Sequence, residues 1–446
     1  MLNIIKNTIN RVFASGVDSD ASAFITATGL SGTTQKSAIT TLVKDLKSSG
    51  LWSKMKAVYP MVTDNRNLFS YTQDTSNAYW GKNNLTLTQN VANPFGANTA
   101  YLMTENSSSG YHVMYSGVVA TTALSTYSCY LKSNGRQWAW LSDNGGGVYF
   151  DLVNGVVGTA SGGRTGSITN IGNGWYRCVV SNNAISGGNQ YYISLSLNGA
   201  DSGNYTGNGT SGIYVYGNQL ELGSTASTYQ PILTTPAAFM ASQMKYNLKD
   251  ARDLDAAFRL TWSGGWTYST NGAQPNGTNG YADTKLVPSA NLSANNIHLS
   301  YYSRTDSAVA SSSTMGADSA TDNLRLIIRR TSNIAFTIIG SATKGLSQFL
   351  VTDSRGLFVA NAPNSTTREL YKNSTSLTPT SQSGLGLNGT PNVNLYLSAY
   401  NNNGVVFEYD NKQCAFSSIG DGLSSAEIAL LNQLITDFQT TLSRNV

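Results

Sequence analysis

The chain has 446 residues, a length that predicts two or three domains because one hydrophobic core rarely serves more than about 300 residues. Charged residues make up 12% of it, whereas it contains 43 glycines and 25 tyrosines; this composition excludes a disordered chain and is typical of β-rich domains with many turns. The formal net charge of +4 is spread without a run of Lys and Arg, and no apolar stretch reaches the about 18 residues of a membrane span. We therefore expect no nucleic-acid partner and no membrane insertion.

Three cysteines, Cys129, Cys178 and Cys414, stand far apart in the sequence. An odd number at long spacing is not a disulfide framework, and the absence of a CxxC motif argues against zinc. Cys129 and Cys178 each lie in a strand-like run of one predicted domain, so they are either neighbours that pair or two buried thiols. The second alternative is favoured because free cysteine is commonly buried.

The first 62 residues carry helical patterns. Apolar residues share one face of a helix over residues 2–13. A second helix is expected to begin with Asp20 as its N-cap and to stop at Gly29, and a third, over residues 39–46, to stop at Gly50. The sequence begins without the apolar stretch of a signal peptide, so we expect synthesis in a cytoplasm without signal-directed export.

From about residue 67 the apolar residues alternate with polar ones, as in strands, and clusters of Gly, Asn and Asp separate these runs. The predicted strands of a first block are 127–131, 174–180 and 213–216, and those of a second block are 297–302, 324–328 and 393–397. The break between the two blocks lies near Pro236.

The chain closes with one predicted helix. Ser424 and Glu427 form an S-x-x-E capping box. An apolar stripe follows, made of Ile428, Leu431, Ile435, Phe438 and Leu442. The stripe predicts a helix that packs on its own domain. The alternative, an oligomer seam of coiled-coil type, would have only about three heptads.

Residues 67–231 resemble a carbohydrate-binding-module-like jelly roll found in phage tail and other virion proteins. The motifs that carry the resemblance are the opening segment 67–74, the NGWYRC strand at 173–178, and the closing segments 205–217 and 219–224. Three motifs in the order of the family make the resemblance specific.

Residues 241–446 are similar to laminin-G-like, concanavalin-type sandwiches. The segments that carry the similarity are 276–283, 298–302, 370–373, where Ser374 replaces the family's glycine, and the closing LSSAE helix start within 422–427. The resemblance implies a mainly β fold with two jelly-roll β-sandwiches, a small N-terminal helical segment and a C-terminal helix.

The helical start and the last block together resemble a family from phages of Bacteroidetes-type hosts. In that family the run at 51–60 is soon followed by the run at 247–258, whereas here about 180 residues intervene. We therefore expect domains at 1–62, 63–240 and 241–446, with the middle one inserted into a loop, which costs little closure entropy.

Catalytic patterns are sparse. The chain has two histidines, His112 and His298, both in strand-like runs that predict structural roles. Concanavalin-type glucanases carry E-x-D-x-x-E on one strand, and the segment that starts at Glu408 matches this pattern except that Gln413 stands at the last position. An amide cannot act as the general acid, so we expect no enzyme.

Aromatic residues provide the candidate ligand-binding positions. Trp138 and Trp140 alternate and therefore point to one face, which is a binding platform if open and core if closed; core is favoured because large aromatics dominate sandwich cores. Tyr214 and Tyr216 alternate with apolar residues and are expected to point outward, whereas other tryptophans, Trp175 and Trp266, are assigned to the core. No catalytic residue, metal ligand or cofactor is predicted; calcium near Asp283 is the one candidate.

The resemblances imply a bacteriophage virion surface protein that is made in the host cytoplasm and used for attachment to cell-surface glycan. Residues 1–20 would anchor it to the particle. Its expected partners are other virion proteins, host surface polysaccharide and further copies of itself, with a trimer favoured. The alternatives are a capsid decoration, head fibre or tail structural protein without receptor binding, and a polysaccharide depolymerase.

Overall fold

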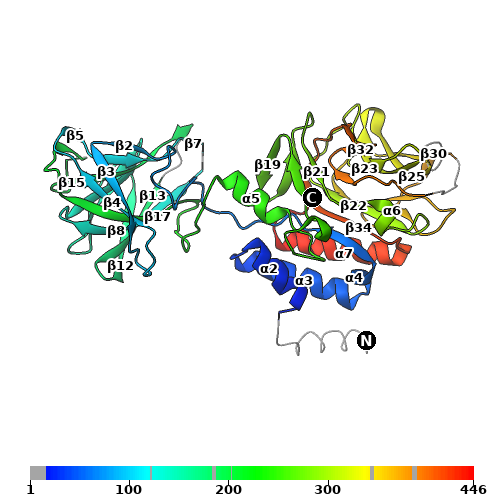
Figure 1. The fold of residues 1–446 in the computed structure, drawn as a ribbon, viewed down its shortest axis with the longest axis horizontal. Coiled ribbons are helices and arrows are strands. Elements are labelled where there is room, and N and C mark those ends of the chain that lie inside the picture. The colour runs from blue at the N-terminus through cyan, green and yellow to red at the C-terminus, as the bar shows by residue number, and fades with distance from the viewer. Residues whose placement is uncertain (1–16, 121–122, 183–186, 202, 342–345, 384–388) are drawn as a thin grey trace. The chain divides into compact units, whose positions relative to one another are not determined.

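A computed structural model of the chain describes residues 17–120, 123–182, 187–201, 203–341, 346–383 and 389–446. They divide into two compact units (Figure 1): unit 1 contains the chain up to Asp64 and again from Met240 to the C-terminus, and unit 2 contains Asn65–Phe239. Both are built mainly from antiparallel strands, which confirms the predicted mainly β fold class. The helix predicted over residues 2–13 lies outside the described residues.

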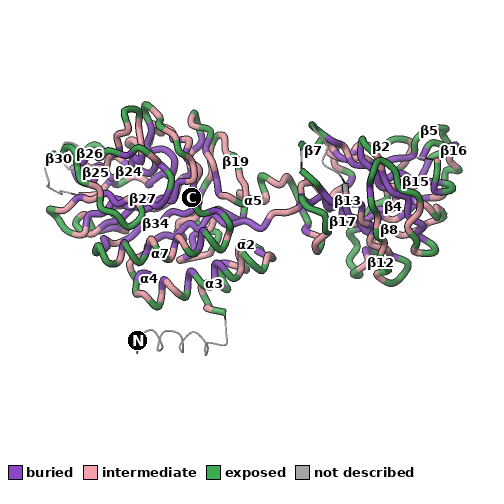
Figure 2. Tube along the Cα trace, turned by 180° about the vertical axis from the view of Figure 1, so that it is seen from behind, coloured by how far each residue is buried: buried purple, intermediate pink, exposed green. Residues whose placement is uncertain are grey.

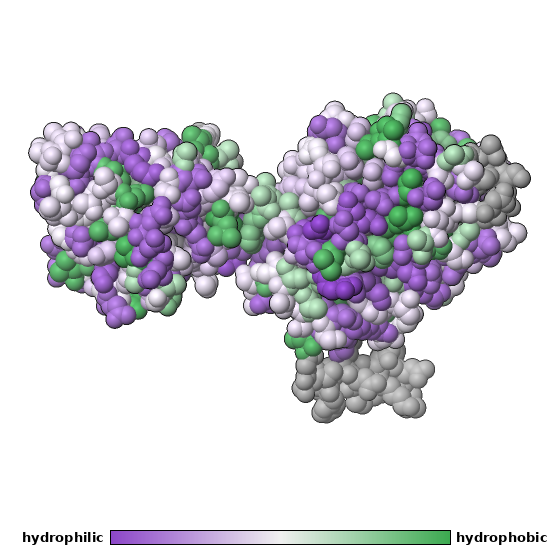
Figure 3. Space-filling model, in the orientation of Figure 1, coloured by the Kyte–Doolittle hydropathy of each residue, from purple (hydrophilic) through white to green (hydrophobic). Residues whose placement is uncertain are grey.

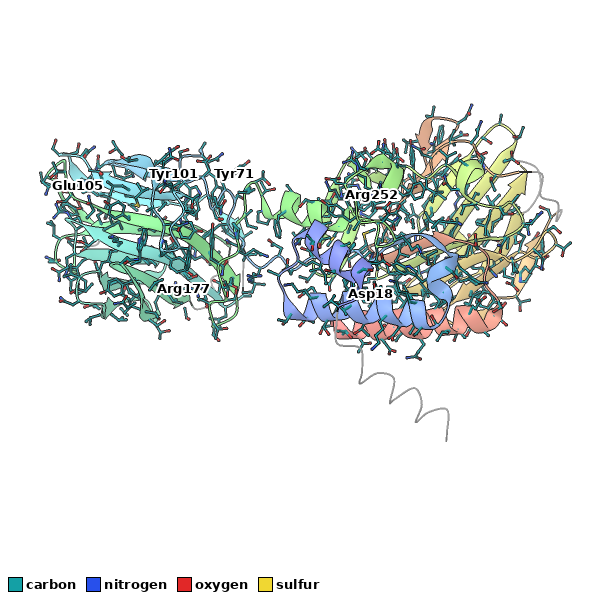
Figure 4. All side chains as sticks on the ribbon, turned by 60° about the horizontal axis from the view of Figure 1, so that its bottom comes forward. Asp18, Tyr71, Tyr101, Glu105, Arg177 and Arg252 are labelled. Atoms are coloured by element: carbon teal, nitrogen blue, oxygen red, sulfur yellow. The ribbon has the colours of Figure 1, made fainter. Side chains whose placement is uncertain are left out.

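The described helices of unit 1 include the predicted helices near residues 20–29, 39–46 and 424–442, of which the second begins earlier, at Thr33, and further helices that the sequence does not predict. They are α2 (Ser19–Thr28), α3 (Thr33–Ser48), α4 (Leu51–Lys54), α5 (Pro236–Met244, which starts in unit 2), α6 (Pro288–Asn291) and α7 (Ser425–Thr441). The side chain of Asp18 (labelled in Figure 4) caps α2 by accepting a hydrogen bond from the backbone N of Asp20 at 2.9 Å, so the predicted N-cap, Asp20, was wrong by two residues. Gly29 and Gly50 follow α2 and α3 as predicted, with φ of 66° and 78°, a region that favours glycine.

Helix α7 begins with the predicted capping box. The backbone N of Glu427 donates to Ser424 Oγ at 3.3 Å, and the backbone N of Ser424 donates to Glu427 Oε2 at 2.8 Å. Its stripe from Ile428 to Phe438 is buried in an apolar cluster with residues of α2, α3 and the neighbouring sheet. The helix therefore packs on its own unit, and the alternative of an exposed oligomer seam does not hold.

Unit 1 is a sandwich of two sheets with a layer of helices on one side (Figure 1). The sheet next to the helices has the order β19-β20-β34-β22-β27-β28-β29, with β1 also paired to β34; its strands are β1 (Met55–Tyr59), β19 (Trp266–Ser269), β20 (Gly272–Pro275), β22 (Ile297–Ser303), β27 (Gly356–Ala362), β28 (Glu369–Lys372), β29 (Thr375–Ser376) and β34 (Cys414–Gly420). The other sheet has the order β18-β21-β31-β23-β24-β25-β26-β30, with β32 on β23 and β33 on β32; its strands are β18 (Thr261–Ser263), β21 (Tyr281–Asp283), β23 (Met315–Asp318), β24 (Asp322–Arg330), β25 (Ile334–Ser341), β26 (Leu346–Leu350), β30 (Pro379–Gln382), β31 (Tyr396–Leu397), β32 (Tyr400–Asn402) and β33 (Val405–Phe407).

Strand β1 departs from the prediction of helix in this region. It pairs antiparallel with β34, so that Val58 lies opposite Ser418. Ala57 and Tyr59 belong to the core between the sheets, whereas Met55 and Val58 belong to the cluster beneath the helices. A strand buried on both faces shows no alternation, which is why its apolar run resembles a helix in sequence. Residues 17–62 thus belong to the same compact unit as residues 240–446.

Unit 2 is a second sandwich, whose central strands are buried while its turns are exposed (Figure 2). One sheet, here called the β9 sheet, has the order β11-β10-β9-β15-β6-β2; its strands are β2 (Gly81–Asn83), β6 (Val113–Tyr115), β9 (Trp138–Asp143), β10 (Gly146–Asp151), β11 (Val156–Ala160) and β15 (Tyr191–Ser196). The other, the β8 sheet, has the order β12-β13-β8-β17-β4-β3; its strands are β3 (Leu85–Val91), β4 (Ala100–Glu105), β8 (Ser125–Asn134), β12 (Thr165–Gly172), β13 (Trp175–Asn182) and β17 (Gly212–Leu222). Two short pairs complete the unit, β5 (Ser109–Tyr111) with β16 (Asn204–Thr206) and β7 (Val119–Ala120) with β14 (Gly188–Asn189).

The cysteines are three free, buried thiols. Cys129 on β8 and Cys178 on β13 lie directly opposite each other in the ladder of the β8 sheet, and both belong to the core of unit 2. Burial raises the pKa of both thiols. The favoured alternative, two buried thiols, therefore agrees with the structure, and the two residues are also the neighbours that the sequence allowed.

Candidate functional site

The outer face of the β9 sheet carries the two alternating tryptophans. On β9, Ala139 and Leu141 are buried in the core of unit 2, whereas Trp138 and Trp140 are half-buried on the opposite side of the strand. The prediction that the two tryptophans belong to the core was wrong. Alternation separates the two faces of a strand but does not say which one faces the partner sheet, and here the smaller side chains do.

The strand register places the outward side chains of this sheet in rows that cross the strands. One row runs through Gly147, Ser142, Tyr192, Tyr115 and Gly81, on β10, β9, β15, β6 and β2. The neighbouring row runs through Tyr149, Trp140, Ser194, Val113 and Asn83 on the same five strands. Aromatic and small polar residues are therefore interleaved over the middle of the face.

A cleft of about 470 Å³ lies over these rows. Its lining consists of Asn83, Tyr111, Val113, Tyr115, Trp140, Ser142, Asp143, Asn144, Gln190, Tyr192 and Ser194. Four of these residues are aromatic, and six carry a hydroxyl, amide or carboxylate group. Apolar ring surface with a few convergent polar groups is the composition that small-molecule and sugar sites share.

Glycines beneath the rings keep the cleft open. A Cβ at Gly81 would lie 2.2 Å from Cζ of Tyr115, and a Cβ at Gly147 would lie 2.5 Å from Nε1 of Trp140. Trp140 also stacks on Tyr149, with ring centroids 5.6 Å apart and an interplanar angle of 16°. Because no Cβ stands beneath them, the Tyr115 and Trp140 rings lie close to the sheet and form the floor of the cleft.

Polar contacts fix one end of the cleft. The hydroxyl of Tyr192 donates to Asn144 Oδ1 at 2.7 Å, and burial raises the pKa of that hydroxyl. Asp143 Oδ1 accepts from Arg164 Nη2 at 2.6 Å and from the backbone N of Gly145 at 2.7 Å, which holds the turn between β9 and β10. The turn and its ion pair therefore set the position of Asn144 at the rim.

The other predicted ligand-binding residues do not join this cleft. Tyr214 and Tyr216 point outward from β17, as predicted, but β17 belongs to the β8 sheet, so they lie on the opposite side of the sandwich from Trp140. They pack in a small aromatic cluster with Trp175. Trp138 lies on the same face as Trp140 but does not line the cleft. Its ring packs over Gly158, where an added Cβ would lie 2.7 Å from it.

Tyr115 and Tyr192 are the functional candidates that the sequence reasoning missed. Each lies in a strand with alternating apolar residues, and their rings lie 6.0 Å apart at an angle of 39°. The available signal was the sequence Gln190-Tyr191-Tyr192-Ile193-Ser194, in which Tyr191 and Ile193 are buried and Tyr192 is not. That signal identifies an outward tyrosine but not the strands beside it.

The two histidines have structural positions. His298 on β22 is fully buried; its Nδ1 lies 2.6 Å from the carbonyl O of Asp421 and its Nε2 lies 3.0 Å from Ser418 Oγ. Burial lowers the pKa of His298 to about 4. His112 is also fully buried, with its ring nitrogens 2.9 Å and 3.2 Å from two backbone carbonyls in unit 2.

The segment that resembles a glucanase motif has no pair of available carboxylates. Glu408 lies outside the strands and accepts hydrogen bonds from both Arg325 and Arg330. Asp410 is fully buried in an ion pair with Lys412, with Oδ1 and Nζ 2.9 Å apart. The motif therefore serves charge pairing inside unit 1.

Asp283 is the one position near which the sequence suggested a metal ion, calcium. Its carboxylate accepts from Lys285 Nζ at 3.0 Å and from Asn394 Nδ2 at 3.1 Å, so cationic and amide donors already occupy it. In the part of the chain that the structure describes, no group of three or more His, Cys, Asp and Glu side chains could hold a metal ion. Among the same residues, no helix has both the length and the apolar character that crossing a membrane requires.

Unit 1 has a larger hollow of about 640 Å³ beside α2. It is lined mainly by small residues of α2 and by the segment from Leu248 to Arg252, and none of the described residues that line it is aromatic. Arg252 and Asp250 form an ion pair at its edge, and Lys249 Nζ donates to the carbonyl O of Trp52. On the face drawn in Figure 3, hydrophilic side chains predominate in each unit and apolar side chains gather in small patches. The hollow beside α2 thus lacks the ring surface that distinguishes the cleft of unit 2.

No protein-family model and no curated protein matches the chain. Among solved structures, a mutant of NanB sialidase from Streptococcus pneumoniae is 14% identical with a TM-score of 0.24, over 37% of this chain and 27% of that chain. The tandem CBM22-1-CBM22-2 domain of Xyn10C from Paenibacillus barcinonensis is 11% identical with a TM-score of 0.22, over 81% of this chain and 98% of that chain. The chain thus spans about a quarter of the NanB structure. TM-scores this low do not indicate a shared fold or a shared ligand.

Proposed function

We propose that this chain binds glycans through the cleft on the β9 sheet. The observation that carries the proposal is the cleft itself, in which Trp140, Tyr115 and Tyr192 lie between amide and hydroxyl groups. Sugar rings have apolar faces that pack on aromatic rings, and their hydroxyls exchange hydrogen bonds with amides and hydroxyls. The cleft, with a volume of about 470 Å³, supplies both kinds of contact.

We further propose that the glycan lies on a host cell and that the chain is a surface protein of a bacteriophage particle. The support is the resemblance of both sandwiches and of the helical start to virion proteins. In this proposal other virion proteins hold the chain on the particle, copies of the chain associate, with a trimer favoured, and the cleft faces the host. Light scattering on the purified chain measures the oligomeric state.

The proposal is one of binding without hydrolysis. Its support is that Glu408, the first carboxylate of the glucanase-like segment, is held by Arg325 and Arg330. A general acid or nucleophile must reach the glycosidic bond with its carboxylate, and a carboxylate shared between two guanidinium groups is already bound.

The test is a glycan array probed with the full chain and with Trp140→Ala. We expect binding to host surface polysaccharide to fall by at least about tenfold in the variant, because Trp140 supplies the ring surface of the cleft floor. Trp138→Ala is the matched control, since it removes the same side chain from the same strand face outside the cleft. Undiminished binding by Trp140→Ala, or absence of any glycan binding by the parent chain, would contradict the proposal.

A further inference from the structure

We infer that the cleft of unit 2 selects uncharged glycan chains and discriminates against those that carry carboxylate or sulfate groups. This inference rests on the proposed function and specifies its substrate class. It follows from the charges that line the cleft and from the way in which the single acidic residue among them is paired.

The described lining residues contain one carboxylate and no Lys or Arg. The carboxylate, Asp143, has a side chain that is 0% exposed, and its partner Arg164 is 4% exposed. Arg164 Nη2 lies 2.6 Å from Asp143 Oδ1, and Arg164 Nε lies 3.2 Å from Oδ2. The two charges therefore neutralise each other beneath the rim, and neither is presented to a ligand.

The groups that are presented are neutral hydrogen-bonding groups. They are the hydroxyls of Tyr111, Tyr115 and Tyr192 and the side-chain amides of Asn83, Asn144 and Gln190, whereas Ser142 and Ser194 are buried beneath them. Hydroxyl groups of a sugar can donate to and accept from each of these. A sugar carboxylate in the same place would lose water without gaining a cation, and burying an uncompensated charge is costly.

The geometry also bounds the length of chain that the cleft contacts. The row from Ser142 on β9 through Tyr192 and Tyr115 to Gly81 on β2 crosses four adjacent strands. Three strand spacings amount to about 14 Å, the length of roughly three linked pyranose rings. The cleft therefore contacts a short stretch of an uncharged chain that lies across the strands.

The experiment uses the full chain and two measurements. An array that holds neutral, uronate-containing, sialylated and sulfated glycans first identifies the ligands that Trp140→Ala no longer binds. The best neutral ligand is then oxidised at its primary alcohols to the uronate and titrated against its parent. We expect the parent to bind at least about tenfold more tightly, with little change between about 50 and 500 mM NaCl.

Asn144→Lys provides the complementary test, because Asn144 is exposed at the rim and a lysine there adds a cation. In this variant, the ratio of the affinity for the neutral ligand to that for the oxidised ligand should fall by about tenfold at low salt. Binding of the oxidised ligand as tightly as its parent, in a Trp140-dependent manner, would overturn the inference and leave the proposed function standing. Failure to bind any glycan would overturn both.

Discussion

The side-chain amide of Gln243 donates a hydrogen bond to the carboxylate of Asp64 at 2.8 Å, and so joins the two points at which the chain leaves and re-enters unit 1. The other oxygen of Asp64 accepts from the backbone N of Ser31 at 2.6 Å and of Gly32 at 2.7 Å, at the start of α3. Contacts within unit 1 thus fix both ends of the segment that forms unit 2.

This relationship predicts that unit 1 folds without unit 2. Replacement of residues 65–239 by a short Gly/Ser linker keeps Asp64 and Gln243 and should give a chain with one cooperative melting transition, because loop-closure entropy changes little with loop length. The isolated segment 65–239 should also fold, since about 175 residues suffice for one core. Calorimetry of the two fragments and of the full chain checks this. A trimmed chain that is unfolded at a temperature at which the full chain is folded would show that the units depend on each other.

A second prediction concerns the glycines beneath the cleft floor. Gly81→Ala should weaken glycan binding by about tenfold, because the added Cβ would meet the Tyr115 ring at 2.2 Å and must lift it into the cleft. Gly158→Ala is the matched control: its Cβ would meet the Trp138 ring at 2.7 Å, on the same sheet but outside the cleft. Isothermal titration with a glycan bound by the parent chain measures both. Equal losses in the two variants would mean that the effect is general to the sheet.

A third prediction is that Glu408 stabilises unit 1 by charge pairing and does not catalyse hydrolysis. The parent chain should release no reducing sugar from the glycan that it binds. Glu408→Gln should destabilise unit 1 by about 2 kcal/mol, because two partly buried arginines lose their shared carboxylate. Burial already lowers the pKa of one of them, Arg325, to about 10.

The control for this variant is Asp306→Asn. Asp306 pairs with Arg329 at 2.5 Å but is 41% exposed, so its loss should cost less than about 1 kcal/mol. Chemical denaturation measures both variants. Sugar release that disappears in Glu408→Gln would instead identify an enzyme.

A fourth prediction is a pH dependence of unit 1 that depends on His298. Burial lowers the pKa of this imidazole from 6.5 to about 4, so below pH 6.5 the unfolded chain takes up a proton that the folded chain does not. Unfolding is therefore favoured as the pH falls from about 6.5 to about 4, by up to about 3 kcal/mol. In His298→Gln this contribution is absent. Denaturation of the trimmed chain at pH 7 and pH 4 should show that the free energy of unfolding falls less in the variant than in the parent. An equal fall in both would show that His298 is not the cause of the pH dependence.

A fifth prediction concerns the cysteines. None of the three thiols should react with a disulfide reagent in the folded chain, because all are buried and burial raises the pKa of each. All three should react after unfolding. Titration of one thiol instead of three in the unfolded, unreduced chain would show that Cys129 and Cys178 had formed a disulfide.

Local signals were sufficient where a structure depends on neighbouring residues. The capping box of Ser424 and Glu427 and the stops at Gly29 and Gly50 needed only a few residues each, and the structure has them as predicted. Strand β1 could not be found in this way, because its partner β34 lies more than 350 residues further along. Its two faces are also buried against different layers, the core between the sheets and the cluster beneath the helices.

The cleft shows the same division between local and distant information. Alternation placed Trp138 and Trp140 on one face, yet the choice between core and surface depended on the position of the β8 sheet. The pairing of β9 with β15, which are about fifty residues apart, places Trp140 and Tyr192 in neighbouring rows. Sequence reasoning thus identified one aromatic residue of the site and missed the two tyrosines that the register adds.

The pairing of β1 with β34 has a consequence for the order in which the protein forms during synthesis. When β1 leaves the ribosome, neither β34 nor α7 has yet been made, so the apolar faces of α3 and β1 are not completely covered until the last strand and helix emerge. All of unit 2 is made in this interval and can fold first, as domains generally do during translation. The first strand therefore remains unpaired, and the apolar faces of α3 and β1 incompletely covered, for most of the translation time. At this stage we expect the nascent chain to need protection from aggregation.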